Sequence, residues 1–120
     1  MATGEGHDLP EITQERLRQH FREQYLLKEP QIDLMLQSAA QSLQHGLKGL
    51  AEAEEHQALI AIYHGLKGLF LNMGEAAWAD YIRTIEGRLK GGETLDHQAF
   101  SAILRRAVDE ILSLAERKEQ

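Results

Sequence analysis

The 120-residue chain contains no cysteine, only two prolines and no long apolar run. The absence of cysteine excludes disulfides, thiolate metal sites and cysteine nucleophiles together. A membrane-spanning helix needs roughly 18 consecutive apolar residues, and no run reaches that length. Residues 1–8 also lack the apolar segment of a secretion signal. We therefore expect a cytoplasmic protein that does not act at a membrane.

Positive charge is also in deficit, because 13 lysines and arginines face 19 aspartates and glutamates and give a formal net charge of −6. Nucleic-acid-binding domains carry clustered positive charge, so nucleic acid is not an expected partner. The 42% apolar and 27% charged residues are typical of a folded chain. We expect a flexible N-terminus over residues 1–12 and one folded domain over residues 13–118.

Strand-like alternation with period two is absent, and five segments instead have apolar residues at helical spacing. The first spans about residues 13–27 and is ended by Pro30. The second ends before a polar turn at residues 51–55, the third spans residues 56–73, and Gly91-Gly92 ends the fourth. The fifth begins at Asp96, a good N-cap. We predict an all-α fold, an antiparallel up-down four-helix bundle with a short N-terminal helix across one end.

Two of these helices have a well-defined apolar face. The third has one apolar stripe, made of Leu59, Ile62, Tyr63, Leu66, Leu69, Phe70 and Met73. The fifth is predicted to be continuous, with a single core face made of Phe100, Ile103, Leu104, Ala107, Ile111 and Leu114.

The third helix also contains two glycines, Gly65 and Gly68, although a glycine inside a helix costs about 1 kcal/mol relative to alanine. At 100° per residue, His64 and Gly68 each lie roughly 160° from the centre of the apolar stripe. Packing within the domain does not explain a glycine opposite the core. A partner molecule that brings its backbone close to His64 does explain it.

A spaced set of residues around this histidine matches a known pattern. It consists of His64, Leu66, Lys67 and Gly68, with Gly74 ten residues after the histidine and Glu86 twenty-two after. This set resembles the histidine phosphotransfer (HPt) domain of bacterial two-component phosphorelays. The resemblance covers roughly residues 31–115, and from residue 86 onward the chain is most similar to the phosphotransfer domain of chemotaxis histidine kinases.

The resemblance implies a carrier that accepts a phosphoryl group on His64 and passes it to a response-regulator receiver domain. The donor would be a histidine kinase or the aspartate of another receiver domain. In this family the Nε2 atom takes the phosphoryl group, Glu86 would accept a hydrogen bond from Nδ1–H, and Lys67 would balance the phosphoryl charge. Without the resemblance, Lys67 is a surface lysine and Glu86 a solvated carboxylate paired with Lys90 four residues on.

Signatures of nucleotide and metal binding are missing. The chain has no P-loop, no glycine-rich strand-to-helix turn and no acidic cluster for Mg²⁺. We therefore expect no cofactor, no bound metal and no enzymatic activity of its own. The partner would supply catalysis and Mg²⁺.

The chain departs from the family five to seven residues after the histidine, where small residues are usual and Leu69, Phe70 and Leu71 stand here. Phe70 is predicted to point into the core, whereas Leu71 lies about 20° from His64 on the helical wheel. With Ile60 on the same flank, Leu71 would form an apolar rim beside Gly65 and Gly68, and a receiver domain would dock on these four residues. A lone exposed leucine is the ordinary alternative.

The hexapeptide His-Gly-Leu-Lys-Gly-Leu occurs twice, at residues 45–50 and 64–69. His45 also lies far from the apolar centre of its helix, so exposure does not distinguish the two histidines. Their surroundings do, since Glu55 lies ten residues after His45 and Lys67 twenty-two after, where the family has glycine and glutamate. We interpret His64 as the acceptor and His45 as a surface residue.

Two other interpretations remain at this point. The first is an HPt-like adaptor or inhibitor that binds a receiver or kinase without accepting phosphate. The second is a metal or haem bundle that uses His45, His56 and His64. The spacing disfavours it, because His56 and His64 are two helical turns apart and no Glu-x-x-His pair occurs.

Overall fold

The computed structural model describes residues 9–118, and this part of the chain is helical without any strand. The all-α class predicted from the sequence is therefore confirmed. The helices are α1 (Gln14–Tyr25), α2 (Glu29–Glu52), α3 (His56–Asn72), α4 (Ala76–Lys90), α5 (His97–Ala107) and α6 (Asp109–Lys118). None of these described helices combines the length and the apolar character needed to cross a membrane.

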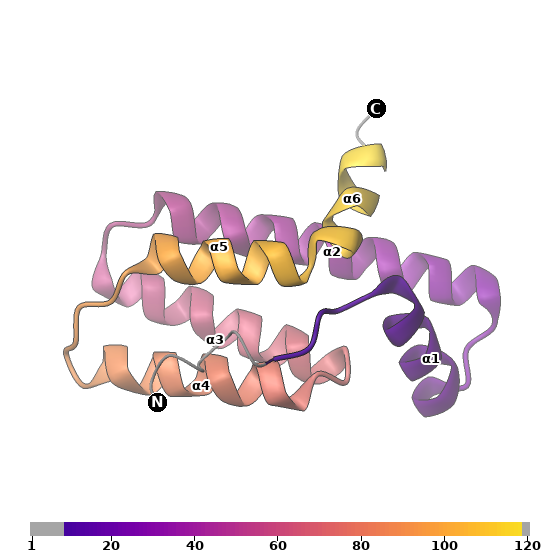
Figure 1. Ribbon diagram of the computed structural model, residues 1–120, viewed down its shortest axis with the longest axis horizontal. Coiled ribbons are helices and arrows are strands. Elements are labelled where there is room, and N and C mark those ends of the chain that lie inside the picture. The colour runs from indigo at the N-terminus through magenta and orange to yellow at the C-terminus, as the bar shows by residue number, and fades with distance from the viewer. Residues whose placement is uncertain (1–8, 119–120) are drawn as a thin grey trace.

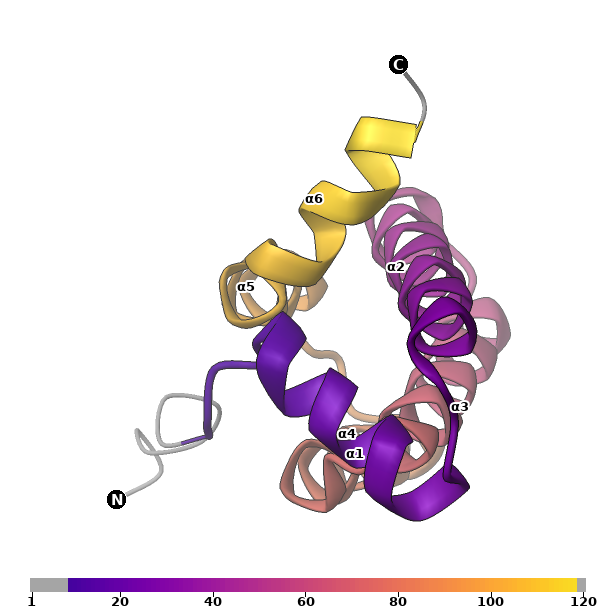
Figure 2. The ribbon, with the colours of Figure 1, turned by 90° about the vertical axis from the view of Figure 1, so that its right-hand side faces the viewer.

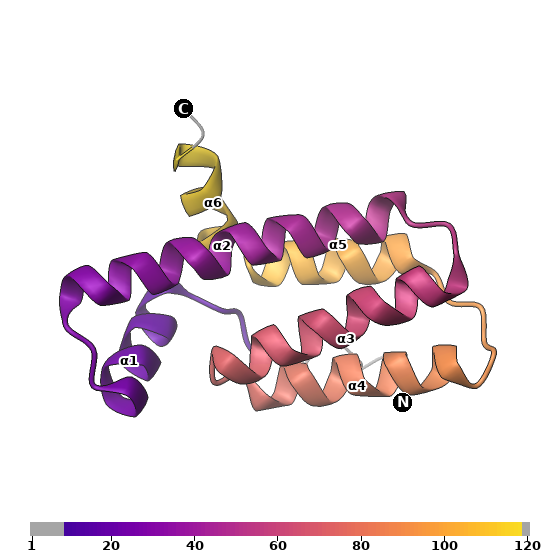
Figure 3. The same cartoon turned by 180° about the vertical axis from the view of Figure 1, so that it is seen from behind.

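Four of the helices, α2 to α5, lie lengthwise along the molecule (Figure 1). Seen from the end, they surround one core, and α1 crosses in front of them (Figure 2). From behind, α2 and α3 run beside each other for much of their length (Figure 3). Each helix contributes a buried stripe to this core, so each is stabilised by its neighbours more than by its own helical propensity.

The turns between these helices follow the glycine and capping signals of the sequence. Gly74, just after α3, has φ of +77°, a conformation that glycine adopts without strain. Gly92, after α4, has φ of +94°. The side chain of Asp96 accepts a hydrogen bond from the backbone N–H of Ala99 at 3.0 Å, which confirms Asp96 as the N-cap of α5.

Side-chain hydrogen bonds bind the short helix α1 to the turn between α3 and α4. Its N-cap Thr13 accepts from the backbone N–H of Arg16 at 3.1 Å. The Arg16 guanidinium then makes two hydrogen bonds, of 2.7 and 3.0 Å, to the buried carboxylate of Glu75. His20 Nε2 lies 3.2 Å from the carbonyl oxygen of Asn72.

The prediction of one continuous fifth helix is wrong, because the helix breaks at Val108 into α5 and α6. The carbonyl of Ala107 accepts from the N–H of Ile12 at 2.9 Å, whereas the N–H of Ile111 donates to Val108. After the break, α6 leaves the direction of α5 and packs on α2 (Figure 1). The core face therefore shifts, so that Val108, Leu112 and Ala115 are buried while Ile103, Ala107 and Leu114 are only partly buried.

The predicted flexible segment over residues 1–12 also needs correction at its C-terminal end. Ile12 is fully buried, and the indole N–H of Trp78 donates to the carbonyl of Pro10 at 2.8 Å. The packed part of the chain therefore begins before residue 13. Residues 1–8 lie outside the described residues.

Candidate functional site

His64 lies in the middle of α3, with an imidazole that is 67% exposed. Its Nδ1 atom lies 3.1 Å from Oε2 of Glu86 on α4. Ile82 and Leu89, one turn to either side of Glu86, are core residues, so the helical period turns Glu86 toward the interior as well. The structure thus joins an exposed ring to a carboxylate that is only 4% exposed.

Two lysines share the same carboxylate. Lys67 Nζ lies 3.2 Å from Oε1 of Glu86, and Lys90 Nζ lies 3.1 Å from Oε2. Burial alone would raise the pKa of Glu86, but the hydrogen bonds from Lys90, Lys67 and His64 outweigh it and hold the pKa below its usual value of 4.5. Glu86 is therefore ionised at neutral pH.

This charge state determines the tautomer of His64. An ionised carboxylate can only accept hydrogen bonds, so the proton of the neutral imidazole must lie on Nδ1. The lone pair is then on Nε2, the ring nitrogen away from Glu86. An exposed ring with a fixed tautomer can act as a nucleophile through Nε2.

The sequence offered two roles for Glu86, as partner of His64 and as partner of Lys90, and the structure contains both contacts. Lys67, expected to balance the charge of a phosphoryl group, contacts Glu86. Lys90 was not among the expected site residues. Its i,i+4 spacing from Glu86 is the signal that identifies it.

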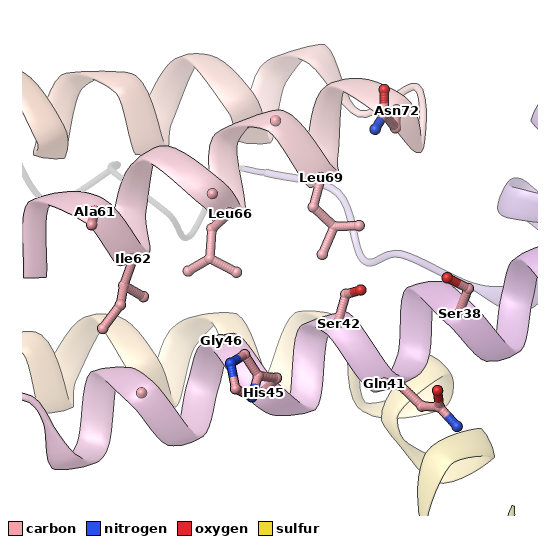
Figure 4. A pocket seen from close by; sticks show the side chains of 13 residues that line it. Ser38, Gln41, Ser42, His45, Gly46, Ala61, Ile62, Leu66, Leu69 and Asn72 are labelled. Atoms are coloured by element: carbon pink, nitrogen blue, oxygen red, sulfur yellow. The ribbon is translucent and has the colours of Figure 1, made fainter. Parts of the chain in front are cut away.

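Gly65 and Gly68 lie on an open part of α3. A Cβ atom at either position would meet nothing within 4 Å, so packing within the described chain does not require glycine there. Both glycines line a groove of about 900 Å³ between α2 and α3, which sequence reasoning missed. Figure 4 shows Leu66 and Leu69 of α3 pointing across this groove toward α2.

The duplicated hexapeptide contributes both walls of the groove. On the α2 side, a Cβ atom at Gly46 would lie 2.7 Å from Cδ2 of Leu66, and one at Gly49 would lie 3.1 Å from Cδ1 of Ile62. These two glycines let the helices approach, whereas the glycines of the second copy leave space open. The repeat is visible in the sequence and was the available signal for this groove. The sequence does not reveal that the two copies face each other across it.

The apolar rim expected beside His64 is present only in part. Leu71 is 55% exposed, but Ile60 is partly buried and packs against the core, so it does not stand beside Leu71 as a free apolar side chain. Phe70 is fully buried, as predicted, and Leu69 is partly buried on the wall of the groove.

The other histidines have different surroundings. His45 is exposed on the wall of the groove, and within residues 9–118 it has no carboxylate partner comparable with Glu86. His56 Nε2 lies 2.5 Å from the carbonyl oxygen of Leu89. In the described part of the chain, no three histidine, aspartate or glutamate side chains are grouped so that they could hold a metal ion.

A scan against protein-family models and searches of curated proteins and of solved structures found no match to this chain.

Proposed function

We propose that this protein is a phosphorelay carrier of the HPt type, which accepts a phosphoryl group on His64 and passes it to a response-regulator receiver domain. The observation that carries the proposal is the 3.1 Å contact between Nδ1 of an exposed imidazole and a buried carboxylate twenty-two residues later. We also propose that α2 to α5 form an antiparallel up-down bundle and that the protein is located in the cytoplasm.

The transfer step uses the tautomer that Glu86 favours. Nε2 of His64 attacks the phosphorus of a receiver acyl phosphate, the N–P bond forms, and the P–O bond to the aspartate breaks to release its carboxylate. The proton stays on Nδ1, so the ring becomes positively charged while the phosphoryl group carries roughly two negative charges. Glu86 stabilises the developing ring charge, as the acid of a catalytic triad does.

Partners supply what the chain lacks. A histidine kinase or a phosphorylated receiver donates the phosphoryl group, and the receiver contributes Mg²⁺ and its own catalytic residues. The protein is then a transfer intermediate and not an enzyme. The receiver would dock on the surface formed by Gly65, Gly68 and Leu71. The Lys67 ammonium, which contacts Glu86, would turn to the phosphoryl group and balance its charge.

The test is incubation of the full chain with receiver domains phosphorylated in advance. The wild-type protein is expected to gain one acid-labile, alkali-stable phosphoryl group, because a phosphohistidine is a phosphoramidate. His64→Gln is expected to abolish the label, and His45→Gln, the matched change in the duplicated peptide, is expected to keep it. Labelling of His64→Gln would contradict the proposal, and receiver binding without any label would indicate an adaptor.

A further inference from the structure

Lys90 and His64 bind the same oxygen of Glu86. Both the Lys90 ammonium and the His64 Nδ1 atom lie 3.1 Å from Oε2, whereas the Lys67 ammonium lies 3.2 Å from the other oxygen, Oε1. The two nitrogen atoms on Oε2 are therefore at most twice that distance apart. The resemblance to HPt domains assigns a role to His64, Lys67 and Glu86 and none to Lys90.

Sharing one oxygen has an electrostatic consequence. A carboxylate that served the imidazole alone would favour its protonated form, and a protonated imidazole has no lone pair for attack. With two ammonium groups and one carboxylate, the group around a neutral His64 has a net charge of +1. The two ammonium groups therefore offset the carboxylate charge that faces the ring, while the hydrogen bond that orients the ring is kept.

We propose that Lys90 is a positioning residue of the His64 site, which offsets the charge of Glu86 so that the carboxylate orients the imidazole and leaves it neutral and nucleophilic. The nucleophilic role rests on the proposed function, whereas the effect on the ring does not. Lys90 is 60% exposed, so its removal leaves no cavity in the core.

Further charged or titratable side chains lie on α4 and α2, the two helices beside α3. On α4, Arg83 pairs with Asp80 at 3.0 Å. On α2, His45 and Lys48 are exposed, and neither makes an ion pair with Glu86 or His64 within the described residues. Lys48 is thus a matched control, because it follows His45 in the duplicated peptide as Lys67 follows His64.

The experiment follows the ring signals of His64 by NMR as the pH is changed, in the full-length chain. Lys90→Met is expected to move the midpoint of this titration upward by roughly 0.5 to 1 pH unit. Lys90→Arg, which keeps the charge, and Lys48→Met are both expected to leave it within about 0.2 unit. An unmoved or lowered midpoint in Lys90→Met overturns the proposal, and so does an equal shift in Lys48→Met.

A double-mutant cycle shows whether Lys90 acts through Glu86. In a Glu86→Gln background, Lys90→Met is expected to cause a clearly smaller shift than in the wild-type background, since the ion pair that holds the Lys90 ammonium near the ring is lost. Equal shifts in both backgrounds would mean that Lys90 acts on the ring directly, against the proposal.

A kinetic measurement separates this proposal from the proposed function. Phosphoramidate transfers its phosphoryl group to imidazole nitrogen and releases ammonia, so the pH profile of labelling can be compared between wild type and Lys90→Met. The rising limb is expected to move upward with the NMR midpoint. A shifted midpoint without label from any donor would refute the carrier function alone, and label with an unmoved midpoint would refute the role of Lys90 alone.

Discussion

At the scale of single residues, the site combines a buried anion with an exposed base. The Glu86 carboxylate is largely shielded from solvent, so its contacts are less weakened by salt than those of a surface ion pair. The His64 side chain, in contrast, is 67% exposed, and its Nε2 atom is the ring nitrogen that does not contact Glu86. In the proposed carrier, the protein would hold one ring nitrogen and leave the other to react, an arrangement that suits precise transfer from a rigid element.

Gly68 provides a test of the docking surface. A Cβ atom at Gly68 would meet nothing within 4 Å in the described chain, and Gly68→Gln removes the backbone-entropy cost of glycine. We expect thermal stability to be unchanged or raised by up to about 1 kcal/mol, and transfer from a phosphorylated receiver to fall at least tenfold. Thermal denaturation and rapid-mixing kinetics measure the two effects.

Gly87 on α4 is the control for helix stability, because it too has nothing within 4 Å. Gly87→Gln is expected to raise stability by a similar amount. If Gly68→Gln unfolded the protein, the open surface around His64 would be refuted. If it transferred at the wild-type rate, Gly68 would have no part in docking.

The residues of the site differ in how far the sequence predicts them. The resemblance to HPt domains selected His64, Lys67 and Glu86 together, whereas the residues alone leave Lys67 as a surface lysine and Glu86 as a solvated carboxylate. Lys90 was visible as an i,i+4 partner, but the sequence does not show that its target oxygen also binds the imidazole. That sharing depends on the distance between α3 and α4, which is a property of the packed core.

At the scale of elements, the connection between α3 and α4 joins three helices. Gly74 has positive φ, and a Cβ atom there would collide with the ring of His20 from α1. Glu75, the next residue, binds Arg16 of α1 through both carboxylate oxygens. This turn therefore holds α1 across the end of the other helices.

Gly74→Ala is expected to destabilise the protein by about 2 to 4 kcal/mol, because it adds both backbone strain and a collision with His20. Gly92→Ala is the matched change, with φ of +94° but open space around the Cβ position. It should cost about 1 to 2 kcal/mol from strain alone. Urea denaturation of both variants gives the difference, and equal losses would show that α1 is not packed against Gly74.

The helix break at Val108 shows why local pattern did not predict every element. The apolar spacing from residue 100 to 114 fits one continuous helix. The break is stabilised by the N–H of Ile12 on the carbonyl of Ala107, and the carboxylate of Glu110 binds the first N–H of α1 at 2.7 Å. In each contact the partner residue, Ile12 or Gln14, lies almost a hundred positions earlier in the sequence. No window of sequence around Val108 therefore contains both members of either contact.

At the scale of the whole molecule, stability is expected to depend on pH through His97 and Glu86. Burial lowers the pKa of His97 below its usual 6.5, opposed by Asp96 and assisted by His56, and its Nδ1 atom lies 2.7 Å from the hydroxyl of the buried Tyr63. The unfolded chain therefore takes up this proton first as the pH falls. Stability should decrease below about pH 6.5 until folded His97 is protonated as well.

The Glu86 carboxylate affects the stability of the protein over a lower pH range. Since its pKa is below 4.5 in the folded state, its contribution is present above that pH and is lost as the pH falls further. Thermal denaturation from pH 8 to pH 3 should show both losses. His97→Gln is expected to reduce the upper loss, and Glu86→Gln the lower one. An upper loss of the same size in His97→Gln would contradict the assignment to His97.

The hydrogen bond between Ile12 and Ala107 also determines what amide exchange near the N-terminus would report. Amides near a chain end usually exchange within moments, through fraying. Ile12 is fully buried and its amide donates to the carbonyl of Ala107 at the end of α5, so its exchange requires that this packed contact open. We expect its deuterium uptake to be slow, and its rate to vary with urea as steeply as the rates of core amides in α3.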